Sequence, residues 1–177
     1  MAQPAPVRVC FVCSGNICRS PMAEVVLREL VRRAGAEGRV EVDSAGTGDW
    51  HVGSAADRRA LRVLAAAGYD GASHRARQFD AGWLADRDLV IALDRGHERA
   101  VRLLVDAAAR RSRTARMPEV RLLRSFDLSA SPDDLDVADP YYGDEAGFRL
   151  VLRQVETACE ALLEHLLAGE RAPARTT

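Results

Sequence analysis

The sequence contains no lysine. All 25 of its basic residues are arginine, and 26 acidic residues bring the net charge to −1. Without an excess of positive charge there is no electrostatic argument for a nucleic-acid partner or for binding to an anionic membrane surface. No apolar run approaches the roughly 20 residues that a membrane-spanning helix needs, and residues 1–6 lack the charged start and apolar stretch of a signal peptide. We therefore expect a cytoplasmic protein with no nucleic-acid and no membrane partner.

Cysteine is scarce, and the long stretch of residues 19–158 has none. The chain has only four: Cys10, Cys13, Cys18 and Cys159. Free thiols are typical of a reducing compartment. The odd offset between Cys10 and Cys13 would place them on opposite faces of a strand, which argues against a shared metal or a thioredoxin-like pair. Three histidines also lack the spacing of metal ligands: His51, His97 and His165. We expect no metal and no cofactor.

Apolar residues make up 47% of the 177-residue chain, as in an ordinary single globular domain. Apolar runs predict strands over residues 7–12, 40–45, 88–93 and 119–123. Helical spacing of apolar residues predicts helices over 21–34, 54–67, 95–110 and 144–168. This alternation predicts an α/β fold, a single-domain three-layer αβα arrangement with a four-stranded parallel sheet. We expect the domain to span residues 1–168, followed by a short disordered tail, residues 169–177.

Residues 11–24, FVCSGNICRSPMAE, carry the most informative pattern. Cys13 is followed after five residues by Arg19, and the apolar run before it suits a strand buried on both faces. Gly15 and Asn16 tolerate left-handed backbone angles, so the loop can curl and direct several N–H groups inward. The pattern predicts a strand, a tight loop and a helix N-terminus, which together form an anion site.

The chemistry expected of this loop is nucleophilic attack on phosphorus. We expect Ser20 to cap the helix, with Pro21 in its first position. A thiol beside a cation at a helix N-terminus has a pKa of roughly 3.5–7.5 instead of ~8.5, so Cys13 should react as a thiolate. Arg19 offers a planar fork of donors for two phosphoryl oxygens. The N–H groups of residues 14–19 would bind the equatorial oxygens of the transition state. The Ser20 hydroxyl is near enough in sequence to hydrogen-bond the sulfur as it becomes a leaving group.

An alkoxide or phenoxide leaving group needs a proton, so a general acid is required. The candidate is Asp139 in DVADPYYGD, residues 136–144. Pro140 keeps Asp139 extended. Tyr141 and Tyr142 would partly desolvate its carboxyl, which favours the protonated form, and would form walls for a flat aryl group. Taken alone, the segment is equally typical of a surface turn.

The chain resembles a low-molecular-weight protein tyrosine phosphatase of the bacterial branch over residues 7–167, with its segments in the family's order. The matching segments are the loop of residues 12–21, DSAGT at 43–47, DWHVG at 49–53, HRARQ at 74–78 and DPYYG at 139–143. The resemblance implies that Cys13 is the nucleophile, Arg19 the phosphate ligand and Asp139 the acid. It implies phosphate contacts from Ser14, Gly15, Asn16, Ile17, Cys18, Arg19 and Ser20. It further implies loop support from Asn16, Ser20, Ser44 and His74, and cleft walls from Trp50, Tyr141 and Tyr142.

Four features allow two interpretations each. Cys18 either forms a reversible disulfide with Cys13 that protects the nucleophile from oxidation, or only packs in the loop. His74 either orders the loop or has an ordinary surface role. Trp50 is either a cleft wall or a core aromatic. The basic run within residues 110–116 is either a solvated connector or a dock for an acidic partner. Its members are Arg110, Arg111, Arg113 and Arg116.

These residues predict a protein tyrosine phosphatase that hydrolyses phosphotyrosine and small aryl phosphates through a cysteinyl-phosphate intermediate. No metal is required, because Arg19 and the backbone donors offset the charge. The expected partners are phosphotyrosine proteins, including a cognate tyrosine kinase, and the expected state is a monomer. A thiol-dependent arsenate reductase is disfavoured because residues 19–158 hold no relay cysteine. A non-catalytic binding module is disfavoured because binding alone needs neither Cys13 nor Asp139.

Overall fold

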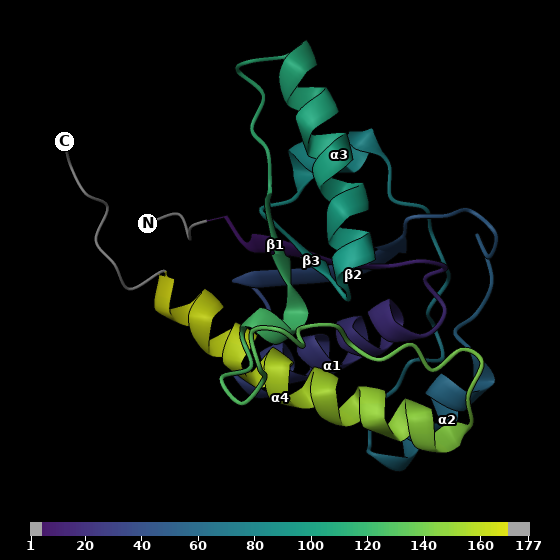
Figure 1. The fold of residues 1–177 in the computed structure, drawn as a ribbon. Helices are drawn as coiled ribbons and strands as arrows, with labels where there is room; N and C mark the ends of the chain where they lie inside the picture. The colour runs from purple at the N-terminus through teal and green to yellow at the C-terminus, as the bar shows by residue number, and fades with distance from the viewer. Residues whose placement is uncertain (1–4, 170–177) are drawn as a thin grey trace.

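A parallel four-stranded sheet with the strand order β2-β1-β3-β4 forms the centre of the protein (Figure 1). The computed structural model describes residues 5–169. The strands are β1 (Val7–Cys13), β2 (Val40–Gly46), β3 (Leu89–Ala92) and β4 (Glu119–Leu122). The predicted fold class is confirmed, and each strand ends within a residue of its expected bounds. Because β1 lies between β2 and β3, the loop that follows it leaves the carboxyl edge of the sheet where ligands bind in open α/β folds.

Strand β1 is covered on both faces. Val9, Phe11 and Cys13 belong to the larger apolar core, whereas Cys10 and Val12 belong to the smaller one. All five side chains are at most 3% exposed. Alternate residues of a strand point to opposite faces, and the predicted separation of Cys10 from Cys13 is confirmed.

The helices form two layers of unequal size. Figure 1 shows α1 (Arg19–Arg33), α2 (Arg58–Ala66) and α4 (Glu145–Gly169) on one side of the sheet and α3 (Arg95–Arg111) on the other. Helix α4 buries an apolar stripe against α1 and the sheet, as its spacing predicts. The buried members of this stripe include Phe148, Val151, Leu152, Val155, Leu162 and Leu166. The middle of the sheet is therefore buried on both faces.

Two helix starts differ from the expectation by more than one residue. Helix α2 begins at Arg58 and not at residue 54, because the Asp57 side chain accepts a hydrogen bond from Arg59 N and caps the helix there. Helix α1 begins at Arg19, with Cys18 in the capping position and no side-chain cap. Ser20 is thus inside the helix, and its hydroxyl is free for another partner. The sequence also gave no indication of two short 3₁₀ helices, residues Ala81–Asp86 and Leu123–Ser125.

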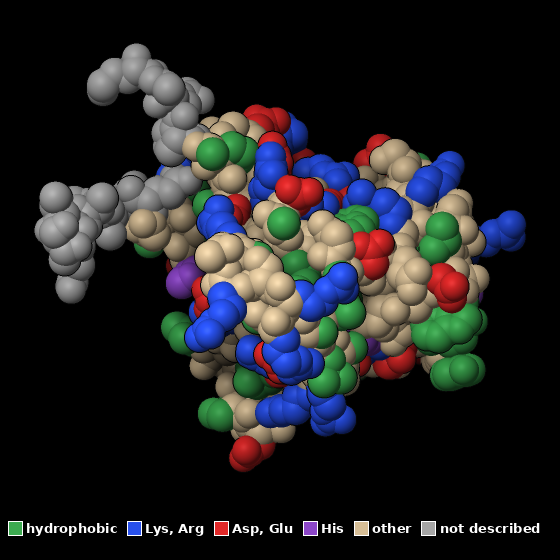
Figure 2. All heavy atoms as spheres, turned by 90° about the horizontal axis from the view of Figure 1, so that it is seen from above, with side chains coloured by type: hydrophobic (Ala, Val, Ile, Leu, Met, Phe, Trp, Pro, Cys, Tyr) green, Lys and Arg blue, Asp and Glu red, His purple; other side chains and the backbone are tan. Residues whose placement is uncertain are grey.

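Arginine side chains are scattered among acidic ones on the face that Figure 2 shows, and do not gather in one area. Arg110 and Arg111 form the last turn of α3, whose carbonyl end favours positive charge. Arg116, in the loop beyond, forms an ion pair with Asp88. These placements suit the solvated-connector interpretation. Gly169, the last residue of α4, is the only described residue of the predicted tail, so the rest of that tail lies outside the described residues.

Within residues 5–169, no helix has the length and apolar character needed to cross a membrane.

Candidate active site

The loop between β1 and α1 places the Cys13 thiol at the base of a cleft. The thiol is almost completely buried, and its Sγ lies 3.0 Å from Ser20 Oγ. Asn16 Nδ2 donates a hydrogen bond to the same oxygen over 2.8 Å. Ser20 Oγ accepts from Asn16, so its single hydrogen can be directed either to the sulfur or to the Ala45 carbonyl, which lies 3.4 Å away. The expected hydrogen bond from Ser20 to the nucleophile is therefore geometrically available.

Asn16 is the central support of the loop. It is fully buried and has φ +55°, the left-handed conformation expected for it. Its Oδ1 accepts from Arg77 N over 2.9 Å, which fixes the orientation of the amide, and its Nδ2 also donates to Ser44 Oγ over 2.9 Å. His74 Nε2 lies 2.7 Å from the Asn16 carbonyl oxygen. The structure thus brings together Asn16, Ser20, Ser44 and His74, the four residues that the resemblance implied as supports.

Gly15 plays a different part from the one expected. Its φ is not among the left-handed values of the described residues. A Cβ at this position would instead lie 2.7 Å from Cδ2 of His51. Glycine therefore leaves room for the His51 ring against the loop. The left-handed angles that Gly15 could tolerate are adopted in the loop by Asn16 and not by Gly15.

Glu24 lies beneath the loop and was not identified from the sequence. Its carboxylate accepts a hydrogen bond from Ser44 Oγ and lies 3.7 Å from His74 Nδ1. Burial alone would raise the pKa of Glu24, but hydrogen bonds from His74 and Ser44 and the charge of Arg28 outweigh burial, so its pKa is lower than usual. An ionised Glu24 can only accept, so it orients the Ser44 hydroxyl and, through it, Asn16. An acidic residue in the first turns of the helix was the only available signal in the sequence.

Arg19 is held by groups from two distant segments. Its side chain is 6% exposed, and its Nη1 donates to Asp94 Oδ2 over 2.9 Å and to the Val137 carbonyl over 3.1 Å. Its Nη2 lies 3.2 Å from Asp139 Oδ2. Burial would raise the pKa of Asp94, but its contacts with the His97 ring and backbone N–H and the Arg19 charge hold it well below its usual range. Asp94 was missed, although an aspartate just before a predicted helix is a recognisable cap signal.

Asp139 lies at the rim of the cleft and not in a desolvated position. Its side chain is 56% exposed, so the expected desolvation by Tyr141 and Tyr142 is wrong. Its Oδ1 accepts from Tyr141 N over 3.1 Å. Arg59, a residue with no sequence signal, donates to the carbonyls of Tyr141 and Gly143 over 3.0 and 2.8 Å. The segment that carries the acid is therefore attached to the start of α2.

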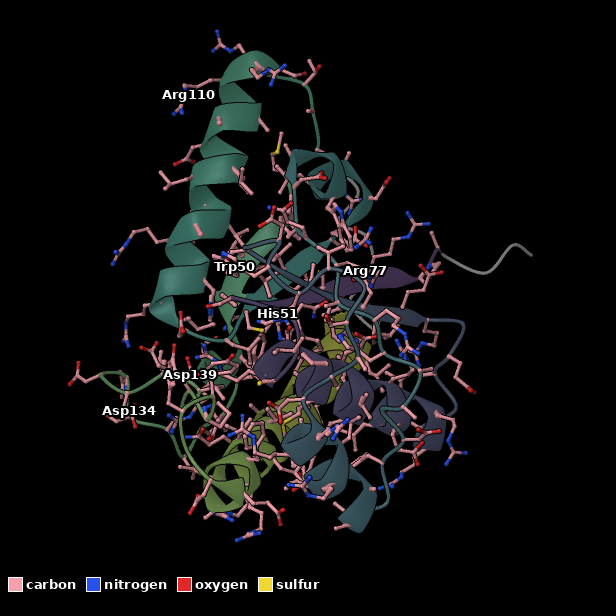
Figure 3. All side chains as sticks on the ribbon, turned by 90° about the vertical axis from the view of Figure 1, so that its right-hand side faces the viewer. Trp50, His51, Arg77, Arg110, Asp134 and Asp139 are labelled. Carbon is pink, nitrogen blue, oxygen red and sulfur yellow. The ribbon has the colours of Figure 1, made fainter. Side chains whose placement is uncertain are left out.

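The cleft has a volume of about 350 Å³ and is open to solvent. Its walls include Trp50, His51, Ile17, Tyr141 and Tyr142, and its base includes Cys13, Cys18 and Arg19. The two tyrosine rings meet edge to face, with centroids 4.9 Å apart. Figure 3 shows Trp50 and His51 near the end of α3 that is opposite Arg110, with Asp139 below them. Trp50 is 71% exposed, which excludes the core-aromatic interpretation.

Cys18 lines the same cleft as Cys13, and both are free thiols in this structure. Burial, with the nearby Asp57 carboxylate and Cys13, raises the pKa of Cys18 to about 12. Cys18 is therefore a thiol at neutral pH and is not itself a nucleophile. The predicted disulfide between the two remains a prediction.

The arrangement of thiol, guanidinium and carboxyl in one cleft agrees with comparison to known proteins. A sequence model of the family described as low molecular weight phosphotyrosine protein phosphatase matches residues 8–172. This chain belongs to that family. The predicted resemblance and the predicted enzyme class, a protein-tyrosine-phosphatase, are confirmed.

Individual relatives of this phosphatase are similar over nearly their whole length. The low molecular weight protein-tyrosine-phosphatase of Streptomyces coelicolor is 55% identical over 160 residues, covering 88% of this chain and 91% of that protein. Low molecular weight protein-tyrosine phosphatase A of Mycobacterium tuberculosis is 50% identical over 157 residues, covering 89% and 90%. The crystal structure of YfkJ from Bacillus subtilis superposes with a TM-score of 0.83 at 32% identity, covering 96% of this chain and all of that one.

Proposed function

We propose that this phosphatase hydrolyses phosphotyrosine and small aryl phosphates in two covalent steps, with Cys13 as nucleophile and Asp139 as acid and then base. The observation that carries the proposal is the shared cleft of the Cys13 thiol, the Arg19 guanidinium and the Asp139 carboxyl. Cys13 and Arg19 come from one loop and Asp139 from a segment 120 residues beyond Arg19. Together they supply a nucleophile, a phosphate ligand and a proton donor. Few other reactions need all three in one cleft.

In the first step the Cys13 sulfur attacks phosphorus and the P–O bond to the aryl group breaks. Asp139 gives its proton to the departing phenolate, which leaves as a phenol. The phosphoryl group is then bonded to sulfur. Arg19 and the N–H groups of the loop bind its oxygens, and their orientation is fixed in advance by Asp94, Val137 and Asn16.

In the second step Asp139, now ionised, takes a proton from water, and the resulting oxygen attacks phosphorus as the S–P bond breaks. The sulfur leaves as a thiolate, which the Ser20 hydroxyl stabilises across the 3.0 Å contact. Asp139 is suited to both steps because its 56% exposed side chain meets water at the cleft rim. Inorganic phosphate is released, and the free thiolate remains.

The preference for aryl phosphates is proposed from the walls of the cleft. Trp50, Tyr141 and Tyr142 line the cleft that contains Cys13 and offer ring surfaces to an aryl group. A phosphoserine side chain is shorter and offers no ring for these walls. We expect a higher kcat/KM for a phosphotyrosine peptide than for the matched phosphoserine peptide, and equal values would contradict the proposed role of the walls.

The central test is hydrolysis of p-nitrophenyl phosphate in the presence of EDTA, by the parent and by Cys13→Ser, between pH 4 and 9. Turnover by the parent alone, with a bell-shaped pH profile, supports the proposal. A folded and reduced parent without turnover would contradict it. Arsenate reduction and phosphopeptide binding, the activities of the two disfavoured alternatives, would then be measured.

Three further expectations belong to this proposal. The nucleophile, the phosphate ligand and the acid that the reaction needs are all present in one chain, so a monomer is the expected active unit. All four cysteines are buried free thiols, which supports a reducing, cytoplasmic location. A cognate tyrosine kinase is the expected source of its phosphotyrosine substrates. Sedimentation, cell fractionation and capture of phosphoproteins by Cys13→Ser would test the three in turn.

A further inference from the structure

His97 is a buried histidine with no role in the mechanism above. It lies in the first turn of α3, and its side chain is 6% exposed. Its Nε2 lies 2.8 Å from Ser14 Oγ, the hydroxyl of the residue that follows Cys13. Its Nδ1 lies 3.0 Å from Asp94 Oδ1. The approach of Nδ1 is too oblique for a well-aligned hydrogen bond, so this nitrogen has no full partner among the described residues.

The surrounding groups decide which ring nitrogen carries the proton. The low pKa of Asp94 means that its carboxylate is ionised and can only accept. A lone pair on Nδ1 would face this negative charge, so the proton belongs on Nδ1. In the tautomer with its proton on Nδ1, Nε2 accepts, and the Ser14 hydroxyl donates to it across the 2.8 Å contact. His97 therefore fixes both the position of Ser14 Oγ and the direction of its hydrogen.

We propose that His97 is a positioning residue that holds Ser14, and with it the first N–H group of the phosphate-binding loop, in the orientation that phosphate requires. This inference rests on the phosphatase function proposed for the loop. The Ser14 backbone is fixed on its other side, because its carbonyl accepts from Gly48 N over 3.0 Å. The side chain of Ser14 is exposed toward the cleft, so the His97 ring is the only protein group that holds it among the described contacts.

His97 and Arg19 are also connected through one carboxylate. Asp94 Oδ2 accepts from Arg19 Nη1, while Oδ1 accepts from His97 N and faces Nδ1. The two walls of the phosphate site, the loop N–H groups and the guanidinium, are thus set by a single cluster at the start of α3. We assign the control of the loop to the contact between His97 and Ser14 and not to the contact between Asp94 and Arg19.

Two substitutions of His97 distinguish its contact with Ser14 from its contact with Asp94. Glutamine places an amide near the position of Nε2 and can still bind Ser14, whereas asparagine reaches only the position of Nδ1 and Asp94. Because loss of one neutral hydrogen bond changes binding by about tenfold, we expect His97→Asn to lower kcat/KM on p-nitrophenyl phosphate by about tenfold and His97→Gln by less than about threefold. The inhibition constant of inorganic phosphate should rise by the same factor as kcat/KM falls. A loss of folded enzyme alone would lower kcat and leave that inhibition constant unchanged.

Ser14→Ala tests whether His97 acts through Ser14, since this variant keeps the backbone N–H and removes only the hydroxyl. If His97 acts through Ser14, His97→Asn should cause no further loss in the Ser14→Ala background. Additive losses, or equal losses for His97→Asn and His97→Gln, would overturn the inference. His165→Gln is the matched control, because His165 is exposed on α4 and its ring packs at a tilt against Phe126, away from the loop.

A measurement on the unsubstituted protein covers the case in which a variant does not fold. The ¹⁵N chemical shifts of the His97 ring should show a protonated Nδ1 and an accepting Nε2. A ring that carries a proton on Nε2, alone or together with one on Nδ1, would overturn the inference. If the unsubstituted protein hydrolyses p-nitrophenyl phosphate while phosphate inhibition is unchanged in His97→Asn, the inference fails and the proposed function stands. Absence of turnover in the parent would instead remove the proposed function and the inference together.

Discussion

Replacement of Glu24 by glutamine should destabilise the protein through the loop supports and not through the apolar core. The Glu24 side chain is 8% exposed, accepts from Ser44 Oγ and lies beside His74 Nδ1. Glutamine has the same shape, but one of its two terminal atoms is a donor. One of the two contacts must therefore be lost or reversed, while no cavity forms.

The magnitude follows from the kind of contact that is lost. Hydrogen bonds to a charged group contribute roughly 1.5–3 kcal/mol each, so we expect Glu24→Gln to lower the free energy of unfolding by about 2 kcal/mol at pH 7. For a chain of this length, that change corresponds to a fall in Tm of about 4–8 °C. The exposed ion pair of Glu24 with Arg28 adds little, because the Arg28 side chain is 54% exposed.

The stabilisation that Glu24 contributes should decrease as pH falls. The pKa of Glu24 is lower in the folded state than its ordinary value of 4.5. Its stabilisation is therefore fully present above that value and is lost as pH falls through the lower folded pKa. The difference in unfolding free energy between parent and Glu24→Gln should be largest near pH 7 and should shrink below about pH 4.5.

Urea unfolding followed by tryptophan fluorescence at several pH values between 3.5 and 7 would measure this difference. Glu29→Gln is the control, since Glu29 lies on the same helix but pairs with Arg32 and Arg33 at the surface. We expect little change in its unfolding midpoint. A Glu24→Gln midpoint equal to that of the parent, or a difference that does not vary with pH, would refute the role assigned to Glu24.

Three other changes test the site. Asp139→Asn should lower kcat on aryl phosphates with poor leaving groups by about 10²–10⁴ and on p-nitrophenyl phosphate far less, and an equal loss on both would argue against an acid. Asp94→Asn keeps a good helix cap but removes the charge that faces Arg19, so kcat/KM should fall by about 10- to 100-fold. An unchanged kcat/KM would show that Arg19 is held in place without the Asp94 charge. In Cys18→Ser, activity lost to peroxide should no longer be recovered with thiol, and recovery equal to that of the parent would exclude a protective disulfide with Cys13.

Local patterns predicted most of the fold and the reacting groups. Some signals are properties of neighbouring residues, so they can be recognised without knowing the fold. These are the apolar run of β1, the glycine and asparagine after it and the helical spacing of α1 and α4. The same holds for the five-residue spacing between Cys13 and Arg19. The first residues of helices α1 and α2 were predicted less accurately, because capping depends on which side chain reaches the free N–H groups. The Asp57 carboxylate does so, and the Ser20 hydroxyl instead faces a sulfur.

The sequence by itself determined the order of strands and helices, the loop that carries Cys13 and Arg19 and the segment that carries Asp139. Only the tertiary structure decided which groups hold them. Arg19 and Asp94 are 75 residues apart, and Ser14 and His97 are 83 apart. Glu24 is close in sequence to the loop that it supports. It contacts Ser44 and His74 only when β2 and the loop before η1 (Ala81–Asp86) pack against α1. Such partners leave no periodic signal, because a buried polar contact depends on where two chain segments cross and not on the residues next to either one.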